Sequence, residues 1–139
     1  MQVETIVNAI KYLTELKEKG LEKIQSNPIL TGAMLWYLYE AIQASIDLAL
    51  KIASKLNLET PESYADVFRI LMMNNLLEKD LAERLIKMAR FRNLLAYAYA
   101  KVDIERVYRE LDDNINDLRA FLNTVKKIID SHKLDLSSF

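Results

Sequence analysis

Cysteine is absent from the 139-residue sequence, which excludes disulfide bonds, thiolate zinc sites and a cysteine nucleophile. Glycine and proline are scarce, with two residues of each, too few to supply the many turns of an all-β fold. The two glycines, Gly20 and Gly32, stand alone, so the chain also lacks a glycine-rich phosphate-binding loop. These absences predict an all-α protein.

Long apolar runs are missing too, since no stretch approaches the roughly 18 uninterrupted apolar residues of a membrane span. The first residues, Met1 to Thr5, lack the basic region and apolar core of a signal peptide. We therefore expect a cytoplasmic protein with no membrane contact. The net charge of -1 means that any nucleic-acid contact depends on a local basic patch.

The sequence offers little for metal binding or acid–base catalysis. Its single histidine, His132, lies in a polar tail, and no cluster of histidine and carboxylate residues has the spacing of a metal site. Asp112 and Asp113 are adjacent, so on a helix they point in different directions and are best read as solvated. We predict no metal and no cofactor.

Apolar residues recur at helical spacing along most of the chain. The pattern predicts helices over residues 3–25, 30–56 and 61–73, a fourth that ends near Arg92, and a last one from Asp103 to about residue 130. The boundaries are marked by capping or helix-stopping residues: Asn27-Pro28, Thr60-Pro61-Glu62, Asn74-Asn75 and Asp103. We expect a single domain over residues 1–139, an up-and-down bundle of four to five helices with a fraying polar tail from about residue 130.

The second predicted helix is apolar nearly all the way round, apart from one polar stripe at steps of three and four: Glu40, Gln43, Asp47, Lys51 and Ser54. One interpretation is that the stripe is simply solvated. The other is that Asp47 or Glu40 faces Arg92 and orients its guanidinium by a carboxylate pair. The apolar remainder must be covered on several sides, which favours a homodimer.

The segment Met88 to Asp103 is densest in potential chemistry, because Arg92, Asn93, Tyr97 and Tyr99 fall where a helix should end. One interpretation places the aromatic residues in the core and the arginines outside. The other has the four polar side chains converge on a site, with Lys87, Arg90 and Lys101 as a phosphate-binding rim.

Residues 92–99 resemble the Arg-x4-His-x-Tyr signature of HEPN-domain ribonuclease toxins of the HepT type, with Tyr97 where the family has histidine. Residues 39–49, 61–68 and 101–103 resemble the family's second helix, third helix and turn into the last helix, in the family's order. The resemblance covers about residues 5–125.

This resemblance implies a HEPN-like homodimer with two motifs facing one cleft, in a type VII toxin–antitoxin system. It implies metal-independent cleavage of an RNA substrate, with Arg92 stabilising charge on the phosphate and Tyr97 at the general-base position. Asn93 and Asp47 would be supporting residues. It also implies a partner, an MntA-like nucleotidyltransferase antitoxin that transfers AMP to Tyr99.

A phenol, with a pKa near 10, is a poor general base at pH 7, and loss of such a base costs about 10² to 10⁴ in rate. We therefore expect a feeble or inactive endoribonuclease. Tyr97 is either a natural divergence or a substitution that inactivates a toxin with a native histidine. The alternative function is a non-catalytic HEPN protein that acts as the substrate-binding partner of a minimal nucleotidyltransferase, and a third is a helical scaffold without a site.

Overall fold

The computed structural model describes the backbone of residues 1–139 and all side chains except those of Tyr99 and Leu136. Over this chain it has six α-helices and two short 3-10 helices. The α-helices are α1 (Gln2–Glu18), α2 (Leu21–Ser26), α3 (Pro28–Lys55), α4 (Asp66–Met73), α5 (Lys79–Tyr97) and α6 (Ile104–Ser131). The 3-10 helices are η1 (Tyr99–Lys101) and η2 (Leu136–Ser138). The predicted all-α class is confirmed.

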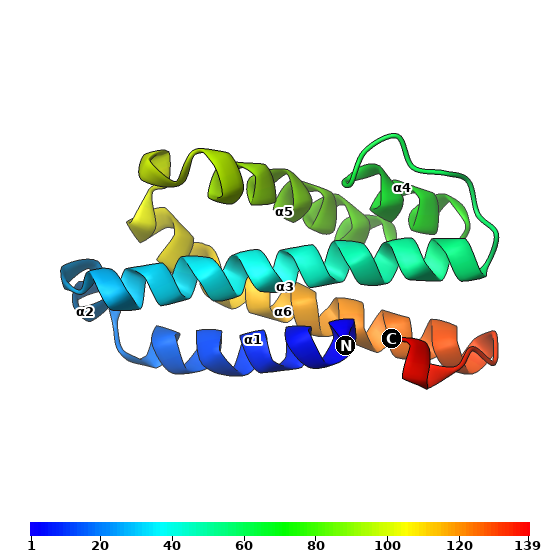
Figure 1. Ribbon diagram of the computed structural model, residues 1–139, viewed down its shortest axis with the longest axis horizontal. Helices are drawn as coiled ribbons and strands as arrows, with labels where there is room; N and C mark the ends of the chain where they lie inside the picture. Colours follow the sequence, from blue (N-terminus) through cyan, green and yellow to red (C-terminus); the bar gives the residue numbers. More distant parts are fainter.

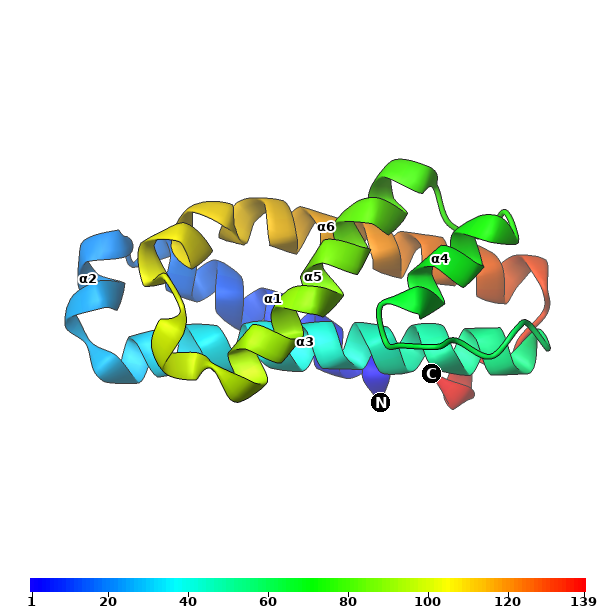
Figure 2. The same cartoon turned by 90° about the horizontal axis from the view of Figure 1, so that it is seen from above.

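Helix α3 is the centre of the bundle, with α1 on one side, α5 on the other and α6 behind (Figure 1). The chain direction alternates from α1 to α3 to α5 to α6, so the up-and-down prediction is also confirmed. Helix α5 crosses α3 obliquely (Figure 2). The short helix α4 lies beside the first turns of α5. The last turns of α5 therefore come to lie over the first half of α3.

The core explains the central place of α3, because buried side chains cover most of its circumference. They include Met34, Leu35, Leu38, Ile42, Ile46, Leu48 and Ile52. Each large apolar side chain contributes about 1.5 to 3 kcal/mol when it is fully buried. In the same core the rings of Phe68 in α4 and Phe121 in α6 meet edge to face, with ring centroids 5.6 Å apart.

The predicted helix over residues 3–25 is split in two by Gly20. This glycine has φ +91°, a conformation that other residues adopt only with strain, so α1 ends before it and α2 begins after it. Asn27 then caps α3, since its Oδ1 accepts from the backbone N–H groups of Ile29 and Leu30.

The predicted start of the third helix at Pro61 is wrong, because α4 begins at Asp66. The carboxylate of Asp66 accepts from the N–H of Glu62 at 3.0 Å, and the Ser63 hydroxyl accepts from the N–H of Asp66 at 3.3 Å. These bonds fold residues 61–65 into a turn in place of a first helical turn.

The predicted end of the fourth helix near Arg92 is too early, because α5 continues to Tyr97. Two further boundary predictions hold. Asn75, at φ +59°, follows the end of α4, and the Oδ1 of Asp103 accepts from the N–H of Arg106 at the start of α6. The prediction that the tail frays is wrong. Phe139 is only 3% exposed, and its carbonyl accepts from the N–H of Val3 at 3.1 Å.

None of the helices in the described structure is both long and apolar enough to cross a membrane.

Candidate functional site

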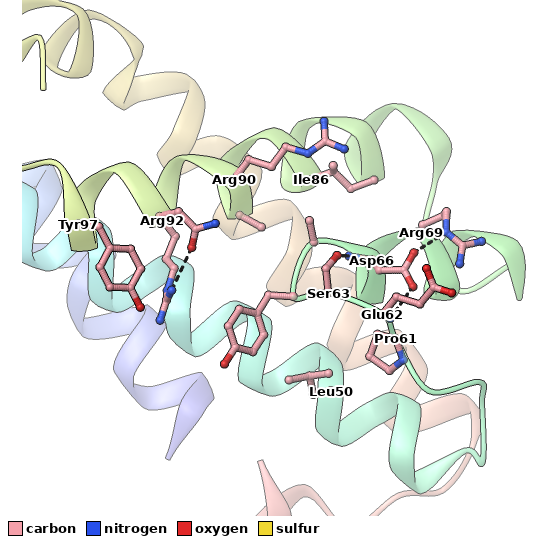
Figure 3. Close-up of a pocket in the computed structure, with 14 residues that line it drawn as sticks. Leu50, Pro61, Glu62, Ser63, Asp66, Arg69, Ile86, Arg90, Arg92 and Tyr97 are labelled. Atoms are coloured by element: carbon pink, nitrogen blue, oxygen red, sulfur yellow. Dashed lines mark hydrogen bonds and ion pairs between the residues drawn. The ribbon is translucent and has the colours of Figure 1, made fainter. Parts of the chain in front are cut away.

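A cavity of about 820 Å³ lies beside the end of α5. Its walls come from α3, the turn at residues 61–65, the start of α4 and the second half of α5. Arg92, Asn93 and Tyr97 all line it (Figure 3). The fold therefore brings three of the five predicted site residues to one cavity.

Arg92 is held by hydrogen bonds from three directions. Its Nε donates to the Oε1 of Gln43 at 2.7 Å, and its Nη1 donates to the Oδ1 of Asn93 at 3.1 Å. A longer contact of 3.5 Å joins Nη2 to the hydroxyl of Tyr39. Gln43 and Tyr39 lie one turn apart on α3, so the central helix fixes the orientation of the guanidinium.

The predicted carboxylate pair with Arg92 is not found. Among the described side chains, neither Glu40 nor Asp47 forms an ion pair with Arg92. Asp47 instead accepts a hydrogen bond at 3.0 Å from the Nε2 of Gln43, and the Oε1 of Gln43 accepts from Arg92. Because the direct partner is a neutral amide, the positive charge of Arg92 is left available for an anion.

Two aromatic rings flank the guanidinium. The Cζ of Arg92 lies 5.6 Å from the ring centroid of Tyr39 and 5.3 Å from that of Tyr64, distances at which cation–π attraction operates. Tyr39 is stacked in turn on Trp36, with centroids 5.9 Å apart. Hydrogen bonds and rings together hold Arg92 half-buried at the cavity wall.

Tyr97 is 82% exposed, so the interpretation that this ring belongs to the core is wrong. Tyr99 opens η1 immediately after the end of α5, but its side chain lies outside the described part of the structure. The predicted role of Tyr99 as AMP acceptor therefore stays a prediction.

Charge is distributed unevenly around the cavity. Arg69 donates to Asp66 at 2.6 Å, and this hydrogen bond, followed by that from the N–H of Glu62, lowers the pKa of the Asp66 carboxyl. The same pair raises the pKa of Arg69. Arg90 and Arg92 have no carboxylate partner among the described side chains, so the excess positive charge lies on the α5 wall.

The predicted basic rim is divided between two places. Arg90 lines the same cavity as Arg92, whereas Lys87 and Lys101 lie in a separate groove between α5 and α6. Within the described side chains, no group of three or more histidine, cysteine, aspartate or glutamate residues could hold a metal ion.

The sequence alone did not assign Gln43, Tyr39 or Tyr64 to this site. Gln43 was noted only as part of a polar stripe, although its spacing of four residues from both Tyr39 and Asp47 places all three on one face of α3. Tyr64 was missed because residues 61–65 were expected to be helical. Its signal is a tyrosine in a short polar segment, which is weak without the fold.

The helical arrangement and its arginine-lined cavity place the protein in the class of HEPN helical bundles, which includes a solved toxin from Shewanella oneidensis. Within that class, the model of the family described as Ribonuclease HepT-like matches residues 6–125. The chain belongs to this family, and the resemblance seen in the sequence is confirmed.

Two curated relatives support the assignment. The chain is 26% identical over 125 residues to the mRNA nuclease HepT of Shewanella oneidensis, which covers 90% of this chain and 93% of that protein. It is 24% identical over 130 residues to a putative RNase of Archaeoglobus fulgidus, with 94% and 97% covered.

Solved structures agree. A crystal structure of a toxin–antitoxin with AMP-PNP has a TM-score of 0.85 at 25% identity, covering 91% of this chain and 95% of that one. The tri-AMPylated Shewanella oneidensis HEPN toxin in complex with its MNT antitoxin has a TM-score of 0.84 at 25% identity, with 91% and 94% covered. The cytosolic protein YutE of Bacillus subtilis, at 19% identity and a TM-score of 0.73, shares the fold.

Proposed function

We propose that this protein is a HepT-like toxin whose metal-independent endoribonuclease site is impaired by Tyr97. The observation that carries the proposal is Arg92, which is oriented by Gln43 and Tyr39 and has no carboxylate partner among the described side chains. Such a guanidinium at the wall of an open cavity suits the phosphate of an RNA backbone. Tyr97 lines the same cavity and occupies the position of the motif histidine, the proposed general base.

The chemistry needs a base and an anion stabiliser. The base takes the proton of a ribose 2′-hydroxyl, and the oxygen attacks the adjacent phosphorus. The 5′-oxygen leaves with a proton from solvent, which gives a cyclic phosphate and a 5′-hydroxyl. Arg92 stabilises the negative charge that develops on the phosphate oxygens, a contribution of about 10² to 10³ for a well-placed donor. Asn93 supports this role by accepting from Nη1 of Arg92.

The proposed partner is an MntA-like nucleotidyltransferase antitoxin, and the proposed modification is transfer of AMP to Tyr99. Support comes from the related toxin, which has been solved AMPylated and bound to its antitoxin. Tyr99 follows Tyr97 by two residues, so an added phosphate would bring negative charge to the segment that carries the site.

We also propose a homodimer. Trp36 is 55% exposed and Ile29 is 81% exposed, and both lie in the first half of α3. Large apolar side chains left uncovered on one helix are typical of an interaction surface. Replacement Trp36→Glu should shift the protein from dimer to monomer in sedimentation velocity, whereas Glu22→Gln, an exposed change on α2, should not.

Single-turnover cleavage of RNA tests the proposed activity. We expect little cleavage by the natural chain, faster cleavage by Tyr97→His in the presence or absence of EDTA, and no gain in the double variant Tyr97→His with Arg92→Ala. If Tyr97→His cuts no faster than the natural chain, the proposed ribonuclease is wrong. The non-catalytic HEPN partner of a nucleotidyltransferase would then be favoured, since an exposed phenol can be modified without being a base.

A further inference from the structure

Tyr64 has an unusual combination of properties for a tyrosine. It is 52% exposed, yet its ring centroid lies 5.3 Å from the Cζ of Arg92 and it lines the site cavity. One part of the ring is therefore against the guanidinium while much of its surface still faces water. Aromatic side chains contribute most when both ring faces are covered, so this ring has stacking capacity that the folded chain does not use.

The backbone that carries Tyr64 is held in place. Asp66 accepts from the N–H of Glu62, Ser63 accepts from the N–H of Asp66, and the carbonyl of Tyr64 itself accepts from the N–H of Val67 at 3.4 Å. Arg69 fixes the Asp66 carboxylate from the other side at 2.6 Å. A ring on such a tied turn loses less conformational entropy on binding than one on a free loop.

The cavity gives this ring a neighbour of the same kind. Tyr97, 82% exposed, lines the same cavity from the end of α5, as does Arg92 (Figure 3). Two open phenol rings and a guanidinium thus share one wall region of a cavity of about 820 Å³. Pockets that enclose small organic ligands are roughly 300 to 1,000 Å³, so there is room for a nucleotide.

We propose that Tyr64 stacks on the nucleobase of the nucleotide whose phosphate binds Arg92, so that the site accepts only unpaired RNA. This inference rests on the proposed function and adds the class of RNA. A base in a duplex has both faces covered by its neighbours, whereas a single-stranded base can be splayed onto an aromatic ring. Such stacking contributes about 1 to 3 kcal/mol per base and tolerates any sequence.

The charge of the cavity supports a nucleic acid over an apolar ligand. Three arginines and two carboxylates line it, and one arginine, Arg69, is already paired with Asp66. One nucleotide could therefore pair its phosphate with the guanidinium of Arg92 and stack its base on the exposed ring of Tyr64.

The test is fluorescence anisotropy with a labelled 2′-fluoro RNA decamer of adenosines, which cannot be cleaved through a 2′-hydroxyl. We expect Tyr64→Leu to weaken binding by about 5- to 150-fold, which is the range of one stacked base. Tyr64→Phe should bind like the natural chain, because the ring is kept. Tyr12→Leu, an exposed tyrosine on α1 outside the cavity, is the control and should not change binding.

Two further probes isolate the base. A decamer of abasic nucleotides should bind the natural chain and Tyr64→Leu equally, and a blunt RNA duplex should bind both weakly. A decamer with 2-aminopurine in place of adenine should lose fluorescence on binding the natural chain and Tyr64→Phe, but not Tyr64→Leu.

The outcomes separate this inference from the function on which it rests. If Tyr64→Leu binds the adenosine decamer as tightly as the natural chain, while Arg92→Ala weakens it, stacking by Tyr64 is refuted and the phosphate site stands. If Arg92→Ala has no effect and the duplex binds as well as the single strand, the proposed RNA site fails together with the stacking.

Discussion

Replacement of Tyr97 by histidine should raise the rate of RNA cleavage. A general base contributes about 10² to 10⁴ to the rate of such a reaction, and histidine is the side chain most often used for that role near pH 7. We therefore expect single-turnover cleavage at pH 7 to be about 10²-fold faster in Tyr97→His, the lower end of that range.

In the structure, replacement of Tyr97 should not disturb the contacts of Arg92. Tyr97 is 82% exposed, and the three hydrogen bonds of Arg92 go to Gln43, Asn93 and Tyr39, so the substitution leaves the arginine in place. The ratio of the single-turnover cleavage rates at pH 7 should therefore report the change of base alone.

Tyr97→Phe is the matched control, because it keeps the ring and removes the base. It should cleave RNA no faster than the chain with Tyr97. Equal single-turnover rates for Tyr97→His and Tyr97→Phe would refute the assignment of residue 97 to the base position.

Three further predictions concern the residues around the site and the bundle. Gln43→Leu removes the acceptor of Arg92 Nε and should lower the free energy of unfolding by about 1 to 2 kcal/mol in urea titrations, with exposed Gln25→Leu near zero. Asp66 has a pKa below its ordinary 3.8, so its stabilising effect is present above that value and is lost as pH falls through the lowered pKa. Urea titrations should therefore show the free energy of unfolding of the natural chain falling more steeply below pH 4 than that of Asp66→Asn. Phe139→Ala should cost about 2 to 3 kcal/mol by the same measurement, less than a typical core phenylalanine because the segment after α6 can close the space; a cost near zero would mean that the packing of Phe139 is not maintained in solution.

The helices were predictable wherever a local signal acted alone. Asn27 and Asp103 cap α3 and α6 as their residue types suggest, since the capping oxygen and its N–H partners lie within three residues. Thr60-Pro61-Glu62 carried an equally good signal and failed. There Asp66 and Ser63, a few residues later, offered the backbone a competing set of bonds.

The site was predictable in part. Arg92, Asn93 and Tyr97 could be found because they are close in sequence and carry polar chemistry at a helix end. Their supports could not, because Gln43 lies 49 residues from Arg92 and the choice between it and a carboxylate depends on the crossing of α5 over α3. Charge complementarity alone selects a carboxylate such as Asp47. In the structure Asp47 bonds to Gln43, and it is Gln43 that contacts Arg92.

The two ends of the chain have a practical bearing on every assay of this site. Met1, Gln2 and Thr5 line a shallow cavity together with Tyr39, Gln43 and Asp47, the residues that support Arg92. The carbonyl of Phe139 accepts a hydrogen bond from the N–H of Val3, so the C-terminus lies close to the N-terminus (Figure 1). An affinity tag on either end would therefore lie next to the support of Arg92, and binding measured on tagged protein should be repeated after the tag has been cleaved off.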